Sequence, residues 1–187
     1  MRYQKIVCFG DSIALGLNDA EGGGWCDRLK RYCLSNFPET QVLNLGIGSE
    51  TSDGLAGRFQ TELAARVFRK EQTLIVLQCG LNDVVQIEHD KRRVPMEYFI
   101  RNLRRVIEQA TSANQSNIDI AIMAITTIAD EFDGVANHDR QVRHQSDIDK
   151  YNDALQKLAE QNGCQFIDVR DVELSEDGLH PSSVGHE

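Results

Sequence analysis

The amino-acid sequence predicts an α/β fold, with one parallel sheet of about five strands and helices on both faces of that sheet. Apolar runs alternate with amphipathic stretches from one end of the chain to the other, as in successive βα units. Several runs are apolar almost throughout, such as TLIVLQC and IDIAIMAI, which is typical of strands covered by helices on both faces. The 187 residues suffice for one domain with a sizeable core, and no linker or repeat divides them, so we expect a single domain over residues 1–187.

The order of the elements follows from the same pattern. Five apolar runs are the predicted strands, at residues 5–10, 41–46, 73–80, 118–126 and 164–171. Four amphipathic stretches are the predicted helices, at residues 25–37, 52–69, 95–113 and 145–162. Pro95 suits the first position of its helix, and Gly163 directly after the last helix is a common stop signal.

Two stretches match neither pattern. Residues 84–93 (VVQIEHDKRR) are polar and charged, and residues 127–144 form a long segment rich in acidic side chains and histidine. Long irregular loops in compact domains often act as lids or binding loops. A solvated surface without further function is the alternative for both.

Charge and cysteine content limit the partners and the compartment. The formal net charge is −9, which argues against a nucleic-acid partner because such binding needs a cationic face. The five cysteines are odd in number and show no CxxC spacing, so we expect free, mostly buried thiols in a reducing compartment. The N-terminus lacks the apolar segment of a signal peptide, and no run of about 18 apolar residues could span a membrane. We therefore expect a cytoplasmic protein, while its oligomeric state stays open.

Chemistry-bearing residues follow four of the five predicted strands. They are Ser12 after the first strand, Gly48 and Ser49 after the second, Asn82 after the third, and Asp177 and His180 after the fifth. Ligands of an open parallel sheet bind beyond the carboxyl ends of its strands, so these residues should meet at one edge. Each signal alone is weak, since a single serine or aspartate here would be read as a cap or a turn.

Together, these residues match the parts of an acyl-transfer site. The Ser12 hydroxyl needs a neighbouring base to become nucleophilic, and His180 suits this role because imidazole titrates near neutrality. Asp177 lies three residues before His180, and in a helical turn this spacing places both side chains on one face. The carboxylate could then orient the imidazole. Such a site requires no metal ion and no organic cofactor.

The same set contains donors for the oxyanion that forms during attack on an ester. Asn82 offers a side-chain N–H, the Gly48-Ser49 turn offers a backbone N–H, and Ser12 offers its own backbone N–H at the start of a helical turn. One such donor typically contributes about 10²–10³ in rate. The sequence therefore predicts a serine hydrolase that acts on small-molecule acyl esters.

Four segments carry a resemblance to a known family. FGDS, the glycine-rich turn after Leu43-Asn44, GLND and DGLHP resemble the conserved blocks of the SGNH hydrolases, also called the GDSL esterase/lipase family. The resemblance implies a flavodoxin-like three-layer α/β/α sandwich and ester hydrolysis through an acyl-enzyme. The family's roles then fall on Ser12 as nucleophile, Asn82 as amide donor, Asp177 as acid and His180 as base. Asp11 would be a structural residue of the nucleophile turn.

The sequence departs from the family pattern in two places. Ser49 occupies the position of the glycine that supplies an oxyanion N–H in the family, and Gly48 lies one residue earlier, so either could donate. The family normally continues past the His-Pro segment into a C-terminal helix, whereas the sequence stops at Glu187. Either a tail is missing or the fold lacks this helix, and the sheet would then lose cover on one side.

Three other functions are alternatives to hydrolysis. Gly46-Ile47-Gly48 after a strand suggests a nucleotide-binding turn, but Thr51 occupies the place of its third glycine. His138, His144 and the acids around them include metal-ligand types without a recognised spacing. The third alternative is a non-catalytic domain of the same fold that binds carbohydrate or another ligand.

Overall fold

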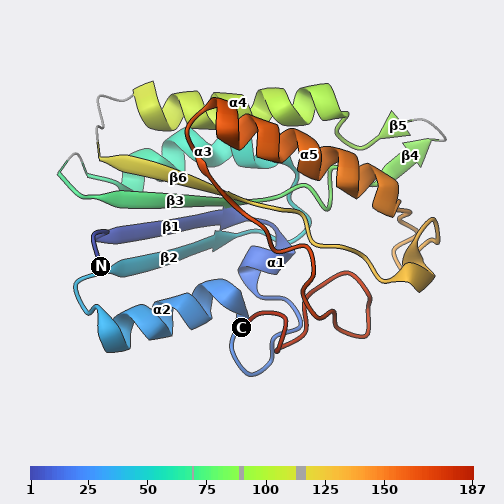
Figure 1. The fold of residues 1–187 in the computed structure, drawn as a ribbon, viewed down its shortest axis with the longest axis horizontal. Coiled ribbons are helices and arrows are strands. Elements are labelled where there is room, and N and C mark those ends of the chain that lie inside the picture. The colour runs from blue at the N-terminus through green and yellow to red at the C-terminus, as the bar shows by residue number, and fades with distance from the viewer. Residues whose placement is uncertain (69, 89–90, 113–116) are drawn as a thin grey trace.

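A five-stranded parallel sheet forms the centre of the molecule (Figure 1). The structure is a computed structural model that describes residues 1–68, 70–88, 91–112 and 117–187. The sheet consists of β1 (Lys5–Gly10), β2 (Gln41–Gly46), β3 (Thr73–Gln78), β6 (Ile118–Met123) and β7 (Gln165–Ile167). Its strand order is β2-β1-β3-β6-β7, which is the flavodoxin-like order and confirms the predicted fold class.

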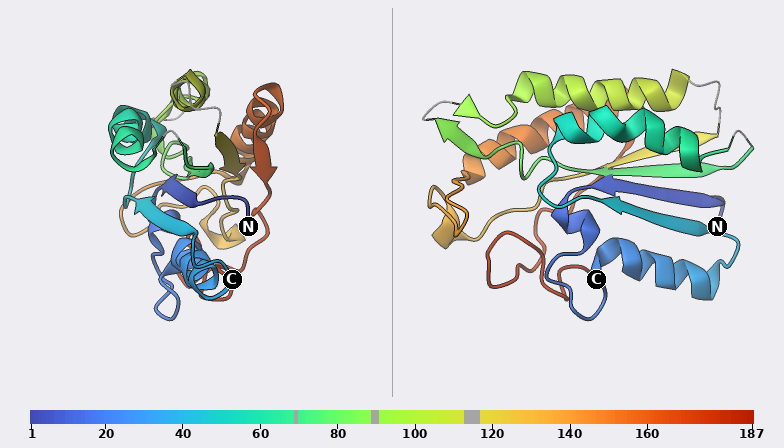
Figure 2. Two further views of the ribbon diagram at one scale, coloured as in Figure 1. Left: turned by 90° about the vertical axis from the view of Figure 1, so that its left-hand side faces the viewer. Right: turned by 180° about the vertical axis from the view of Figure 1, so that it is seen from behind.

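Helices cover both faces of the sheet and give three layers (Figure 2). The long helices α3 (Ser52–Arg66), α4 (Met96–Ser112) and α5 (Gln145–Gln161) lie on one face. The short helix α1 (Ser12–Leu15) and α2 (Gly24–Asn36) lie on the other. Because the connection from β1 crosses one face and the connection from β2 crosses the other, the topology reverses between β1 and β3.

The alternation of side chains along β1 divides the core between these faces. Val7 and Phe9 belong to the large cluster under α3, α4 and α5, whereas Ile6 and Cys8 belong to a smaller cluster beside α2. All four side chains are buried, as expected for a strand paired on both edges with helices above and below. Burial on both faces explains why this strand is apolar without interruption.

Several predicted elements end earlier in the structure. The last strand was expected over residues 164–171 but covers only Gln165–Ile167, because β7 is an edge strand that pairs with β6 at three positions. β3 and β6 end two and three residues before the predicted boundaries, at Gln78 and Met123. The helix predicted over residues 52–69 ends at Arg66, since Val67 is extended. Residues 69 and 113, the predicted ends of two helices, lie outside the described residues.

Residues 84–93, expected to be irregular, contain a short antiparallel hairpin. β4 (Gln86–Glu88) pairs with β5 (Lys91–Arg92), while residues 89 and 90 lie outside the described part. Residues 127–144 contain one 3₁₀ turn, η1 (Asp130–Phe132). The two stretches meet where the Gln86 backbone N–H donates to the Val142 carbonyl at 2.8 Å. Both stretches lie beyond the carboxyl ends of the strands of the central sheet, as Figure 1 shows.

One face of the sheet is only partly covered. Next to α2, side chains of β3, β6 and β7 line an open cavity of about 490 Å³, among them Val76, Met123 and Ile167. In the part of the chain that the structure describes, no helix is both long and apolar enough to cross a membrane.

Candidate active site

The first strand ends on a sharp turn that displays Ser12. A Cβ on Gly10 would lie 2.4 Å from the Gln78 carbonyl oxygen of the neighbouring strand, so only glycine fits there. Asp11 follows as the N-cap of α1, and its Oδ1 accepts from the Ile13 N–H at 3.0 Å. Burial raises the pKa of Asp11 to about 7. Asp11 thus shapes the turn, as expected, and Ser12 begins the helix at the edge of the sheet.

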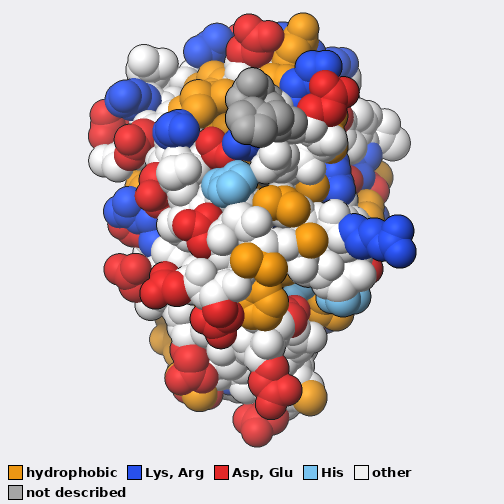
Figure 3. Space-filling view, turned by 90° about the vertical axis from the view of Figure 1, so that its right-hand side faces the viewer, with side chains coloured by type: hydrophobic (Ala, Val, Ile, Leu, Met, Phe, Trp, Pro, Cys, Tyr) orange, Lys and Arg blue, Asp and Glu red, His pale blue; other side chains and the backbone are white. Residues whose placement is uncertain are grey.

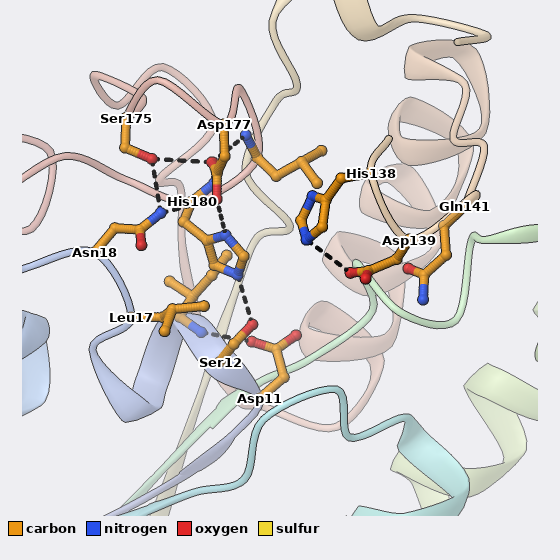
Figure 4. Close-up of polar contacts among 12 residues, drawn as sticks. Asp11, Ser12, Leu17, Asn18, His138, Asp139, Gln141, Ser175, Asp177 and His180 are labelled. Carbon is orange, nitrogen blue, oxygen red and sulfur yellow. Dashed lines mark hydrogen bonds and ion pairs between the residues drawn. The ribbon is translucent and has the colours of Figure 1, made fainter. Parts of the chain in front are cut away.

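Ser12, His180 and Asp177 form a continuous chain of hydrogen-bond contacts (Figure 4). The Ser12 Oγ lies 2.8 Å from His180 Nε2, although the two residues are 168 positions apart. The other ring nitrogen, His180 Nδ1, lies 2.6 Å from Asp177 Oδ2. The three residues that were expected to act together are therefore in direct contact.

Asp177 is held by donors on both carboxylate oxygens. Its Oδ1 accepts from the backbone N–H groups of Leu179 and His180, each at 2.9 Å, and from the Ser175 hydroxyl at 2.9 Å. Asn18 Nδ2 donates to Oδ2 at 2.8 Å. Partial burial alone would raise the pKa of Asp177, but these backbone bonds and the His180 contact outweigh it and hold the pKa well below its ordinary value. The segment is a turn closed by Asp177 and not the helical turn that the spacing suggested.

Asn82 lies in the turn after β3, with its carboxamide between two partners. Its Nδ2 donates to the Glu50 carbonyl at 3.1 Å, and its Oδ1 accepts from Arg143 Nη2 at 3.4 Å. The next residue, Asp83, is buried and accepts from both the N–H and the hydroxyl of Ser52, the first residue of α3. Burial raises the pKa of Asp83 to about 6.

The glycine-rich turn after β2 brings Gly48 and Ser49 to the same edge. The Glu50 N–H donates to the Ile47 carbonyl at 3.2 Å, which closes the turn around them. Ser49 adopts a left-handed conformation with φ of 61°, and a Cβ on Gly48 would point into open space. Either backbone N–H remains a candidate oxyanion donor.

All six predicted site residues line one cavity of about 450 Å³. These residues are Ser12, Gly48, Ser49, Asn82, Asp177 and His180. The stretch 127–144 contributes much of the opposite wall, including His138 and Gln141. Figure 3 shows this end of the molecule, where histidine lies beside a band of hydrophobic side chains with acidic groups around it.

The two histidines weighed as metal ligands do not come together. His138 lines the cavity and lies 3.2 Å from Asp139, whereas His144 Nε2 contacts Gln86 at 2.8 Å. Among the described residues, no three histidine, cysteine or acidic side chains are grouped as a metal site would require.

Comparison with known proteins identifies the family. The model of the GDSL-like lipase/acylhydrolase family matches residues 8–187. The chain belongs to this family. The match spans all of the segments FGDS, GLND and DGLHP, so it covers the residues that form the cavity.

Individual proteins similar to this GDSL-like chain share 30% or less of its residues in the matched part. The uncharacterized lipoprotein YqeF of Bacillus subtilis (strain 168) is 30% identical over 113 residues, which make up 58% of this chain and 44% of that protein. The chain thus matches less than half the length of this relative. A G-D-S-L lipolytic protein from Veillonella parvula has a TM-score of 0.71 at 21% identity, over 97% of this chain and 91% of that one. The acetylxylan esterase Axe2 from Geobacillus stearothermophilus gives 0.72 at 20% identity, over 97% and 88%. These structures show the same fold.

Three residues at the site were not anticipated from the sequence. Asn18 and Ser175 bind Asp177, and Arg143 binds Asn82. Arg143 belongs to the stretch 127–144 that was suspected of forming a binding loop, but nothing in its spacing indicates where its side chain lies. Asn18 follows Ser12 closely, and its left-handed backbone (φ of 68°) could not be read from the residue type alone.

Proposed function

We propose that this GDSL-like protein is a serine hydrolase that cleaves small acyl esters through an acyl-enzyme on Ser12. The chain of contacts from Ser12 to His180 to Asp177, at 2.8 and 2.6 Å, is the observation that carries the proposal. Family membership supports it, because the family model describes lipases and acylhydrolases.

In the first step, His180 Nε2 takes the proton of the Ser12 hydroxyl while Oγ bonds to the ester carbonyl carbon. The carbonyl oxygen becomes an oxyanion, which accepts hydrogen bonds from Asn82 Nδ2 and from backbone N–H groups of Ser12 and of Gly48 or Ser49. Asp177 stays ionised, in keeping with its lowered pKa, and stabilises the imidazolium.

The intermediate then collapses, and the bond from carbon to the alcohol oxygen breaks. His180 returns its proton to this oxygen, so that the alcohol leaves and the acyl group stays on Ser12. Water attacks the acyl carbon in the second half, with His180 again as base. The acid leaves, and the proton on His180 Nε2 returns to Ser12 Oγ.

The cavity favours a short acyl group and a polar alcohol. Among the described residues that line it, Leu17, Leu81 and Leu179 contribute large apolar side chains, while most others carry hydrogen-bonding groups. The leucine side chains could contact the acyl group, and the hydrogen-bonding groups around them could bind a polar alcohol. The structural likeness to an acetylxylan esterase supports acetylated carbohydrate as one substrate to test.

Release of p-nitrophenol from the acetyl and octanoyl esters tests this function. We expect turnover of the acetyl ester by the wild type, its loss in Ser12→Ala and His180→Ala, and a fall of about 10⁴-fold in Asp177→Asn. Ser35→Ala, which changes an exposed serine of α2, is the matched control and should keep full activity. Equal rates in the wild type and in Ser12→Ala would contradict the proposal, and so would a fluorophosphonate adduct on any residue other than Ser12.

A further inference from the structure

Arg143 is a buried cation that forms no direct ion pair with a carboxylate of the described residues, although Asp11, Asp139 and Asp177 lie near enough to favour its charge. Its side chain is only 5% exposed, and its hydrogen bonds run to a backbone carbonyl and to two carboxamides. Burial lowers the pKa of Arg143 to about 10, with repulsion from Arg93 as a smaller cause, so the guanidinium still carries its charge at neutral pH. A buried charge without a direct ion pair is costly, and neutral groups could hold the fold together at this place.

The contacts of Arg143 converge on the turn that carries Asn82. Its Nε donates to the Leu81 carbonyl at 2.8 Å, and its Nη2 donates to Asn82 Oδ1 at 3.4 Å. Nη2 also donates to Gln141 Oε1 at 2.8 Å, which fixes the guanidinium from the side of its own loop. One rigid cation thus contacts two consecutive residues of the β3 turn.

Arg143 and the Glu50 carbonyl together decide which way the Asn82 carboxamide faces. A guanidinium has only donors, so the group next to it must be the amide oxygen. The amide nitrogen then donates to the Glu50 carbonyl, and Asn82 lines the same cavity as Ser12. In the reversed orientation, the NH₂ group would lie against the guanidinium, and oxygen would face the developing oxyanion.

We propose that Arg143 is a positioning residue, which holds the carboxamide of Asn82 with its N–H toward the oxyanion and polarises that N–H. The proposal rests on the proposed hydrolase function. Its effect belongs to the transition state, because the oxyanion forms only there, and substrate binding should change little. A residue that merely fastened the 127–144 loop would instead affect stability or KM.

A double-mutant cycle with Asn82 tests the proposal. The variants are Arg143→Met, Asn82→Ala and their combination, assayed with p-nitrophenyl acetate, with thermal unfolding recorded for each. We expect Arg143→Met to lower kcat about 10–100-fold at nearly constant KM, and Asn82→Ala to lower it about 10²–10³-fold. The combined variant should be no slower than Asn82→Ala alone, since Arg143 would act through the missing amide. Arg140→Met removes an exposed charge from the same loop and should leave kcat unchanged.

Each other outcome has a distinct meaning. If Arg143→Met lowers kcat by the same factor with and without Asn82, Arg143 does not act through the amide and the proposal is wrong. Arg143→Lys repeats the cycle with the charge kept, which matters if the methionine variant does not fold. Full kcat in Arg143→Lys would contradict positioning, because an ammonium cannot reproduce the planar fork. If Ser12→Ala turns over the ester as fast as the wild type, the proposed hydrolase function is wrong. This result concerns Ser12 alone and is therefore distinct from every outcome for the Arg143 and Asn82 variants.

Discussion

In the turn after β1, the neighbouring residues Asp11 and Ser12 make different contacts. Ser12 reaches His180, while Asp11 points back to cap α1 and is fully enclosed. A carboxylate enclosed in this way resists ionisation, and its raised pKa has a consequence for stability.

We expect the free energy of unfolding to decrease as the pH rises from about 4 to 7. In this range, Asp11 keeps its proton in the folded protein, where its pKa is about 7, and loses it in the unfolded chain, where its pKa is near 3.8. The folded state binds more protons, so rising pH favours unfolding. Asp83, with a pKa of about 6, contributes in the same direction.

Asp11→Asn should make this pH dependence shallower by up to about 1.4 kcal/mol per pH unit, since asparagine can still accept the Ile13 N–H but does not titrate. Urea unfolding of both proteins at several pH values measures the slope. Identical slopes would show that Asp11 ionises normally in the folded state.

Ser49 carries a backbone cost that glycine would avoid. A left-handed conformation costs a residue with a Cβ about 1–2 kcal/mol, and part of this is offset by the higher entropy of glycine in the unfolded chain. Ser49→Gly should therefore raise stability by up to about 1 kcal/mol and keep kcat, because the backbone N–H remains. Gly48→Ala is the contrast, since its Cβ meets open space and its φ is not left-handed. Thermal melting checks both variants. A lower melting temperature for Ser49→Gly would contradict the inference that the left-handed backbone of Ser49 costs stability.

Among the elements, α3 depends on a side chain from another turn. Asp83 accepts the Ser52 N–H at 3.0 Å and the Ser52 hydroxyl at 2.5 Å, so the β3 turn anchors the first residue of this helix. The same helix packs Phe59 against Phe9 of β1, with ring centroids 4.8 Å apart. The start of α3 and the turn that carries Asn82 are thus one unit.

Asp83→Ala should destabilise the protein by about 1–3 kcal/mol, because a buried N–H and a buried hydroxyl lose their acceptor. It should also lower kcat, since the neighbouring Asn82 would lose its fixed backbone. Urea unfolding and the ester assay check the two effects. A stable variant with wild-type kcat would show that the anchor is dispensable.

The elements could be predicted from the sequence more accurately than their ends or their contacts. Strands and helices follow from hydrophobic periodicity, which burial against a sheet imposes on the chain. β7 was predicted too long because its length is set by pairing with β6, which is not a property of its residues. The hairpin at Gln86–Glu88 was missed because its strand partners are polar and short.

Site residues could be predicted where the reaction requires a particular residue type. Residues that act by contacting another site residue could not be predicted. Serine, histidine and aspartate at strand ends point to one another through their roles in acyl transfer. Arg143 and Asn18 have no such signature, because an arginine or an asparagine in a loop is usually solvated. Only the folded contacts reveal that each binds a site residue.

Across the whole molecule, Asp19 joins distant parts of the chain. Its buried carboxylate accepts from the N–H groups of Gly22 and Gly24, from the Arg28 side chain and from the Ser183 hydroxyl. The Arg28 contact is the largest cause of a pKa far below the ordinary value. The loop after α1 is thereby fastened to the segment that follows His180.

Asp19→Asn should destabilise the protein by about 1–3 kcal/mol, since an amide NH₂ would face donors that the carboxylate now accepts, while Arg28 would keep only its contact with Glu187. Amide hydrogen exchange should become faster in residues 181–187, while protection of the central strands is retained. The wild type should lose the contribution of Asp19 as the pH falls below about 4, where the unfolded chain takes up a proton first. Exchange that is unchanged at 181–187 would contradict this role.

The reversal of topology between β1 and β3 also places the residues proposed for the reaction and the residues that could select the substrate on different parts of the fold. Ser12 and Asn82 stand at that reversal on strands with neighbours on both sides, whereas the stretches 84–93 and 127–144 are attached outside the sheet. Apart from Arg143, Gln141 and buried residues such as Val84, exposed residues of these stretches could be exchanged for those of a relative without moving Ser12 or Asn82. If the proposed function holds, loop grafting of this kind could change the substrate selectivity while the contacts among Ser12, His180 and Asp177 are kept.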